Sequence, residues 1–98
     1  MDTERINQLL HDWHELSLAE FRAKHYNNLT DDWFNEQYPK HAVEKKKYIY
    51  LDDGGSGAFL IDKEDGTVYT IKGYGVKNRR IGHIDTITGA TLQARRWR

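Results

Sequence analysis

The chain has 98 residues, a length that allows one folded domain, and its 12% aromatic content favours a folded chain over a disordered one. It contains no cysteine, which excludes disulfide scaffolds, thiol nucleophiles and cysteine-ligated metal sites. No apolar run approaches the roughly 18 residues of a membrane span, and the first residues lack the pattern of a secretory signal. We therefore expect a small soluble protein of the cytoplasm.

The net charge of zero conceals an asymmetry between two parts of the chain. Residues 1–64 contain 13 acidic and 8 basic residues, whereas residues 65–98 contain 2 acidic and 7 basic residues. A basic segment that includes aromatic residues can contact phosphates, but it can equally balance an acidic part of the same protein or form a solvated tail. All three interpretations stay open at this point.

The first third of the chain predicts helices. Apolar residues recur at the helical spacing of three to four at Ile6, Leu9, Leu10, Trp13 and Leu16. Ser17 followed by Glu20 has the spacing of a capping box, so we predict that a second helix begins at Ser17. Thr30 predicts the N-cap of a third, short helix, which Pro39 ends.

After the charged segment 44–47 the pattern becomes that of strands. The segments 48–51, 58–61, 67–71, 80–84 and 91–95 are predicted strands, and Asp65-Gly66 is a typical hairpin turn. We predict one α+β domain over residues 1–98, with about three N-terminal helices (1–41) on one face of an antiparallel sheet (46–98) of roughly three to five strands. The residues expected in its core are Leu9, Leu10, Trp13, Phe21, Leu29, Phe34, Leu51, Leu60 and Ile71.

Metal and phosphate sites have little support in the sequence. His11 and His14 share a helix face, but a zinc site needs three or four convergent ligands. The segment 52–57 pairs two aspartates with glycines, yet it lacks the spacing of a calcium loop and of a phosphate-binding loop. We expect no metal and no cofactor, although the sequence leaves open whether this turn binds an ion.

Catalysis has little support either. A nucleophile would require a serine or threonine together with a histidine and an acid, for which Ser56, His83 and Asp85 are the available residues. Nothing in the sequence marks an oxyanion hole around them. We expect that the protein is not an enzyme.

Part of the sheet segment carries a resemblance. Residues 65–75 read D-G-T-V-Y-T-I-K-G-Y-G, and residues 82–86 read G-H-I-D-T. This pattern, within about residues 57–87, resembles short uncharacterised proteins of tailed bacteriophages and related mobile elements. The resemblance transfers no catalytic residue. It implies that the protein binds a host protein or nucleoprotein complex and blocks it, with an anti-defence inhibitor, such as an anti-CRISPR protein, as the leading version.

The predicted contact residues are aromatic and basic, because Trp, Tyr and Arg dominate the binding energy of interfaces. They centre on the loop Gly73–Arg80, with Tyr48 and Tyr50 on the sheet face away from the helices. The set is Tyr48, Tyr50, Tyr74, Lys77, Arg79, Arg80, Arg96 and Trp97. Two alternatives stay open: Tyr74 folds back over the sheet and serves only the fold, or the basic C-terminal third binds nucleic acid through phosphates.

Overall fold

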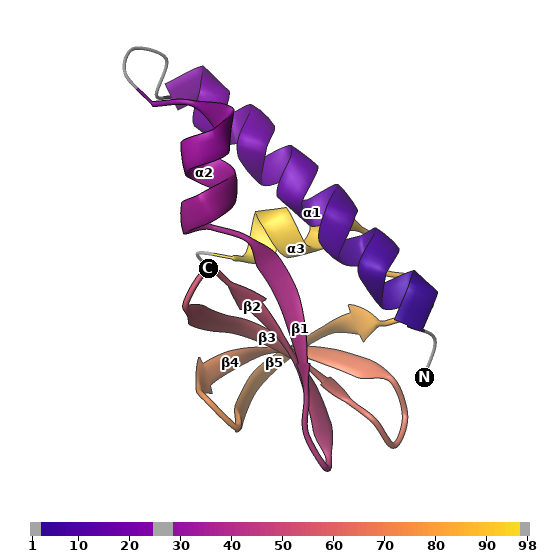
Figure 1. Cartoon of the computed structure of the whole chain (residues 1–98). Helices are drawn as coiled ribbons and strands as arrows, with labels where there is room; N and C mark the ends of the chain where they lie inside the picture. The colour runs from indigo at the N-terminus through magenta and orange to yellow at the C-terminus, as the bar shows by residue number, and fades with distance from the viewer. Residues whose placement is uncertain (1–2, 25–28, 97–98) are drawn as a thin grey trace.

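The computed structural model describes residues 3–24 and 29–96, which form three helices and a five-stranded sheet (Figure 1). The elements are α1 (Thr3–Lys24), α2 (Asp31–Gln37), β1 (Lys40–Glu44), β2 (Tyr48–Asp53), β3 (Ser56–Asp62), β4 (Thr67–Gly73), β5 (Val76–His83) and α3 (Gly89–Arg95). The α+β class is confirmed. The arrangement of the helices differs from the prediction.

The prediction of a helix start at Ser17 is wrong, because α1 runs without a break from Thr3 to Lys24. The apolar stripe continues past Ser17 through the buried Leu18 and Phe21, which keeps the segment helical. The Ser17 hydroxyl donates to the side chain of Gln93 instead of capping a helix. The N-terminal part therefore contains two helices, one long and one short.

The short helix α2 begins as predicted. Thr30 is its N-cap, and the Thr30 hydroxyl accepts a hydrogen bond of 3.1 Å from the Trp33 backbone N–H. Leu29, which was expected in the core, is 41% exposed because it lies ahead of the cap, outside the packed face of α2. Ile71, also expected in the core, is only partly buried.

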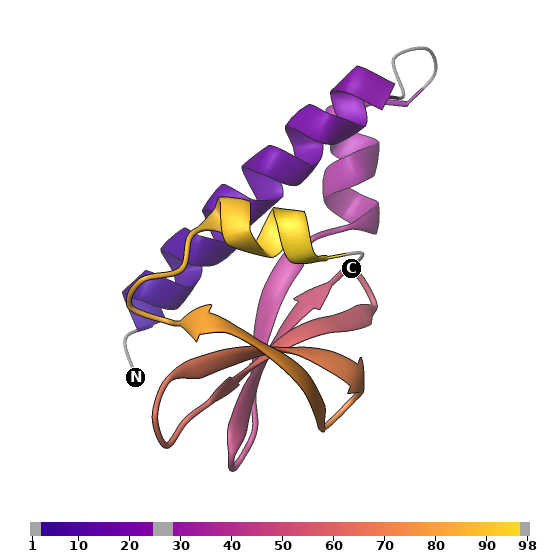
Figure 2. The ribbon, with the colours of Figure 1, turned by 180° about the vertical axis from the view of Figure 1, so that it is seen from behind.

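The sheet is an antiparallel meander in which the spatial order β1-β2-β3-β4-β5 equals the chain order. Its strands fan out by a strong twist around a common centre (Figures 1 and 2). The predicted hairpin turn at Asp65-Gly66 is present. Gly66 has φ +77°, in the region that favours glycine, and the Asp65 carboxylate accepts a bond of 2.8 Å from the Thr67 N–H.

Two elements were assigned wrongly from the sequence. Strand β1 lies partly in the range predicted as helical, and the charged segment 44–47 lies in the β1–β2 hairpin instead of preceding the first strand. Residues 91–95 belong to helix α3, not to a strand. Thr88 and Thr91 form a capping box at its start, and Leu92 buries its apolar side, which explains why this segment is helical.

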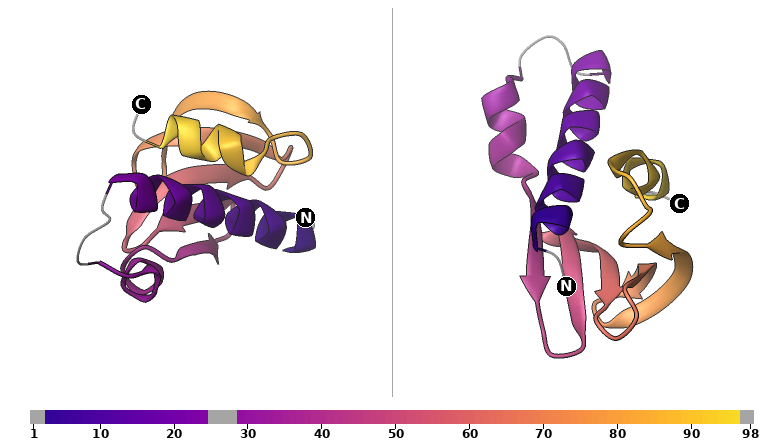
Figure 3. Two further views of the ribbon diagram at one scale, coloured as in Figure 1. Left: turned by 90° about the horizontal axis from the view of Figure 1, so that it is seen from above. Right: turned by 90° about the vertical axis from the view of Figure 1, so that its right-hand side faces the viewer.

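The helices cover one face of the sheet. Figure 3 shows α1 crossing the sheet with α2 on one side and α3 on the other. The main core joins α1, the inward side chains of the central strands, and the segment from Ile84 to Leu92. A smaller apolar cluster, made of Leu18, Phe21, Phe34 and the partly buried Trp33, joins α1 to α2. No helix of residues 3–24 or 29–96 has the length and apolar character needed to cross a bilayer.

Candidate functional site

The sheet face that points away from the helices, called the open face below, is lined by tyrosines. Strand register places Tyr50, Leu60 and Tyr69 side by side across β2, β3 and β4. Tyr48 lies on the same face and meets Tyr50 edge to face, with ring centres 6.2 Å apart. Leu60, in the middle of this row, is fully buried. The tyrosine rings thus form a packed layer on the open face.

Tyr74, in the β4–β5 turn, folds back over this layer and still remains accessible. Its ring stacks on Tyr50 with centres 4.0 Å apart, and it packs over Gly57, where an added Cβ would lie 2.8 Å from a ring carbon of Tyr74. Tyr74 nevertheless keeps 53% of its surface exposed. The ring is therefore held in one orientation while half of it faces solvent.

Lys77 is fixed on the same layer. Its ammonium lies 4.6 Å from the ring centre of Tyr69 and 5.3 Å from that of Tyr48, and it donates to the Asp62 carboxylate at 2.8 Å. This hydrogen bond raises the pKa of Lys77 and lowers the pKa of Asp62. Lys77 is thus a cation that Asp62 and the two tyrosine rings hold in place on the open face.

The β4–β5 hairpin as a whole is basic and exposed. Residues 67–83 contain four Lys or Arg residues and no acidic residue. Every residue from Lys72 to Arg80 is exposed. Tyr74 and Val76, the large apolar side chains exposed at its tip, lie among these cations. We call residues 72–80 the hairpin surface.

A buried carboxylate lies beside this surface. Asp52 is 8% exposed and lies between His41, whose Nε2 is 3.6 Å from Asp52 Oδ2, and the side chain of Tyr74. Burial raises the pKa of Asp52, and the charge that His41 carries when protonated opposes this shift. The Tyr74 pKa is raised by burial and by the Asp52 charge. Asp52 therefore links the edge strand β1 to the tip of the β4–β5 hairpin.

One of the predicted contact residues, Arg96, does not join the open face. Arg96 lies on the helix-covered side, where its Nε donates to Asp53 Oδ2 at 3.1 Å. Trp97 lies outside the described residues. The structure brings Tyr48, Tyr50, Tyr74 and Lys77 together and leaves Arg79 and Arg80 exposed on the neighbouring strand β5. Tyr69 belongs with them, and its alternation with Val68 along β4 was the signal for that placement.

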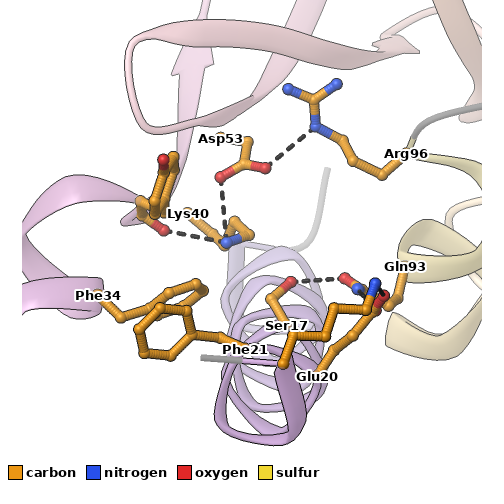
Figure 4. A pocket seen from close by; sticks show the side chains of 10 residues that line it. Ser17, Glu20, Phe21, Phe34, Lys40, Asp53, Gln93 and Arg96 are labelled. Atoms are coloured by element: carbon orange, nitrogen blue, oxygen red, sulfur yellow. Dashed lines mark hydrogen bonds and ion pairs between the residues drawn. The ribbon is translucent and has the colours of Figure 1, made fainter. Parts of the chain in front are cut away.

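Arg96 belongs instead to a pocket on the helix side, shown in Figure 4. Lys40 forms part of its wall, and the Lys40 side chain is only 1% exposed. Its Nζ donates to the Tyr38 carbonyl at 3.0 Å and lies 3.1 Å from Asp53 Oδ1. Burial lowers the pKa of Lys40, while the Asp53 charge opposes this shift. Sequence patterns gave no signal for this buried lysine.

The residues that the sequence offered for catalysis do not all lie together in the structure. Ser56 is the first residue of β3, at the β2–β3 turn. His83 pairs with Thr67, the first residue of β4, which follows the far end of β3, so the length of β3 separates Ser56 from His83. His83 Nε2 lies 2.7 Å from the Asp65 carbonyl oxygen, and His83 Nδ1 accepts from the Asp85 backbone N–H. Within the described part of the chain, no group of three or more His, Asp or Glu side chains could hold a metal ion.

Comparison with known proteins adds no relative. No family model, no curated protein and no solved structure matches the chain.

Proposed function

We propose that this is a non-catalytic binding protein that attaches to a host macromolecule, in the first place a protein or nucleoprotein complex, and blocks it. The observation that carries the proposal is the hairpin surface, a continuous exposed segment in which a held aromatic ring lies among cations. Tyr and Arg supply most of the binding energy at protein interfaces.

The layer beneath the hairpin surface supports this proposal. Stacking on Tyr50 fixes the Tyr74 ring, so binding does not have to order it. Lys77 is fixed by Asp62 and two tyrosine rings in the same way. A preorganised aromatic centre with a charged rim is the anatomy of a protein interface.

The biological setting rests on the resemblance of residues 57–87 to small phage proteins. A phage-encoded inhibitor would act in the cytoplasm of the host cell, and its target would be part of the host defence, with an anti-CRISPR role as the leading version. No membrane partner is proposed.

A nucleic-acid partner is the second candidate, and the composition of the β4–β5 hairpin favours it. Four cations without an acid on residues 67–83 can follow a phosphate backbone, and the exposed half of Tyr74 can stack on a base. The Asp52 and Asp62 carboxylates beside these rings would repel phosphates, so we place the protein partner first.

Comparative affinity capture from bacterial lysate tests the proposal. The bait is the unmodified protein, and the test variant carries Tyr74→Ala, Arg79→Ala and Arg80→Ala. A matched control carries Asn7→Ala, His11→Ala and Glu15→Ala, three exposed residues at helical spacing on α1. A partner recovered by the protein and the control but lost by the test variant supports the hairpin surface. Equal recovery by all three baits contradicts it.

Salt dependence then separates the two kinds of partner. Binding through several phosphates weakens by orders of magnitude between about 50 and 200 mM salt, because counterions are released. A protein interface with an aromatic centre weakens far less. A steep dependence, together with binding to a single-stranded oligonucleotide, would favour the nucleic-acid partner over the protein.

A further inference from the structure

The two edges of the sheet differ in their regularity. Strand β5 forms one edge, and its pairing with β4 shifts register at three places, which protects an edge from further pairing. Strand β1 forms the other edge, and all five of its residues pair with β2 without a shift. In Figure 1, β1 lies in front of the other strands, and no helix of the described residues crosses it there. The edge of β1 is therefore a regular template for one more strand.

The hydrogen bonds at the two ends of the β1–β2 ladder show which backbone groups face outward. The Lys45 N–H donates to the Tyr48 carbonyl, and the Gly54 N–H donates to the Pro39 carbonyl, each at 2.8 Å. In an antiparallel ladder, residues that bond to the neighbouring strand alternate with residues that do not. The residues of β1 whose N–H and C=O groups point to the free edge are therefore Lys40, Ala42 and Glu44.

A hollow beside this edge has room for the side chains of an added strand. It lies between α1 and β1 and has a volume of about 410 Å³. Its walls include Ile6 and Leu10 from α1, and Ala42 and Ile49 from the sheet. Because side chains alternate between the two faces of a sheet, every second side chain of an added strand would point under α1. The hollow therefore favours apolar residues at alternate positions.

The turn that follows β1 places positive charge at one end of this edge. Lys45, Lys46 and Lys47 are exposed, and the adjacent Glu44 already pairs with Lys63 at 2.9 Å. A strand that pairs with β1 in the antiparallel direction has its N-terminal end beside this turn. Charge complementarity therefore favours acidic residues at the N-terminal end of such a strand.

We propose that the β1 edge binds an extended segment of a partner protein as an added antiparallel strand, in which acidic residues precede alternating apolar residues. A second copy of the chain fits poorly. Lys40 and Glu44 of its β1 are held by ion pairs, so only the methyl group of Ala42 would reach into the hollow. This binding goes beyond the proposed function, because it does not use the hairpin surface.

The probe is the peptide Asp-Glu-Asp-Val-Thr-Leu-Thr-Val, acetylated and amidated at its ends. In the proposed pairing its apolar residues lie opposite Glu44, Ala42 and Lys40, and its acidic residues lie beside the lysines of the turn. We expect saturable NMR shifts of the β1 amides of the unmodified protein. Bound peptide should also slow hydrogen exchange at these three outward-facing amides more than at the β1 amides that face β2.

Two N-methylated peptides test the backbone pairing. N-methylation of the leucine removes the N–H that would donate to the Ala42 carbonyl, so binding should weaken at least about tenfold. N-methylation of the threonine that precedes it is the matched control, because that N–H would point away from β1. Binding of the control peptide should weaken less than about threefold.

Two protein variants test the contribution of charge. Lys45→Gln together with Lys46→Gln should weaken binding of the peptide at least about threefold. The control, Lys24→Gln with Arg95→Gln, removes two exposed cations from α1 and α3 and should change binding less than about twofold. Melting temperatures establish that both variants are folded. If either is unfolded, the two N-methylated peptides on the unmodified protein still decide.

Three results would overturn the proposal: no saturable binding, shifts confined to the hairpin surface, or equal weakening by the two N-methyl groups. Shifts of the β1 amides that depend on protein concentration in the absence of peptide would assign this edge to a second copy and would overturn it as well. Capture through the hairpin surface is measured separately, so either surface can fail without the other.

Discussion

The two faces of the sheet differ in how they are built, although the same strands form both. The covered face is apolar and closed by α1 and α3, with Trp13 and Phe59 meeting edge to face at its centre. The open face consists of tyrosine rings and fixed charges. The neighbouring residues Asp52 and Asp53 illustrate the division, since Asp52 contacts His41 and Tyr74 while Asp53 contacts Lys40 and Arg96.

The contrast between the two faces predicts which substitutions should lower stability and which should lower binding. Side chains of the covered face lose nearly all their exposure, so their removal costs transfer and cavity energy. The side chains of the hairpin surface stay accessible, so truncating them should cost less stability than truncating a fully buried side chain, even though Tyr74 then loses its stack on Tyr50. Substitutions on the covered face should therefore lower stability, and those on the hairpin surface should lower binding.

The largest effect is expected from Trp13→Ala on the covered face. Trp13 has no exposed surface, and its removal should cost about 3–5 kcal/mol of unfolding free energy. Leu16→Ala is the matched control on the same helix, because Leu16 is 41% exposed and should cost far less. Urea unfolding monitored by circular dichroism measures both. Equal losses for the two variants would contradict the assignment of the core.

A smaller effect is expected from Thr88→Ala, which tests how α3 closes the covered face. The Thr88 hydroxyl accepts a hydrogen bond from the Thr91 N–H at 3.3 Å, and loss of such a cap typically costs about 1 kcal/mol. Thr88→Ser keeps the hydroxyl and should retain most of the stability. The same unfolding experiment applies, and similar losses for Ala and Ser would show that the cap contributes little.

The smallest effect is expected from Asp52→Asn beside the open face. Because the pKa of Asp52 is raised by burial, the folded protein binds this proton more tightly than the unfolded chain does. The stability from this group is present at low pH and is lost as the pH rises through its folded pKa. Asparagine mimics the protonated form, so the stability of the variant relative to the unmodified protein should increase from about pH 3 to pH 7.

Unfolding free energies across this pH range measure that trend. Asp85→Asn is the control, because the Asp85 side chain is 75% exposed and lacks the burial on which the trend depends. A relative stability of Asp52→Asn that falls with increasing pH would show that the Asp52 charge stabilises the fold.

The sequence predicted those parts of the fold that local chemistry determines. Thr30 and Gly66 carry turn and cap signals whose hydrogen bonds lie within a few residues, and both are correct. The pattern at Ser17 and Glu20 is equally local, yet long-range packing overrides it: Gln93, from α3, takes the Ser17 hydroxyl. Residues 91–95 satisfy strand and helix patterns alike, and the capping box of Thr88 and Thr91 together with the packing of Leu92 in the core selects the helix.

The candidate site likewise contains some features that the sequence predicted and others that it could not predict. Alternation along β2 placed Tyr48 and Tyr50 on the face away from the helices, and register then brings Tyr69 to them. The stacking of Tyr74 on Tyr50 could not be predicted, because it depends on the reach of the β4–β5 turn over Gly57. Nor could the position of Arg96, which depends on how α3 packs against α1 and brings Arg96 to Asp53 at the end of β2.

The most direct test of the division between the two faces measures affinity and stability on one variant. With the partner isolated by capture, Tyr74→Ala, Arg79→Ala and Arg80→Ala together should weaken binding by more than about 2 kcal/mol, while the melting temperature changes little. Titration calorimetry and thermal unfolding give the two values. Unchanged binding with a large drop in melting temperature would contradict the account, because these residues would then serve the fold.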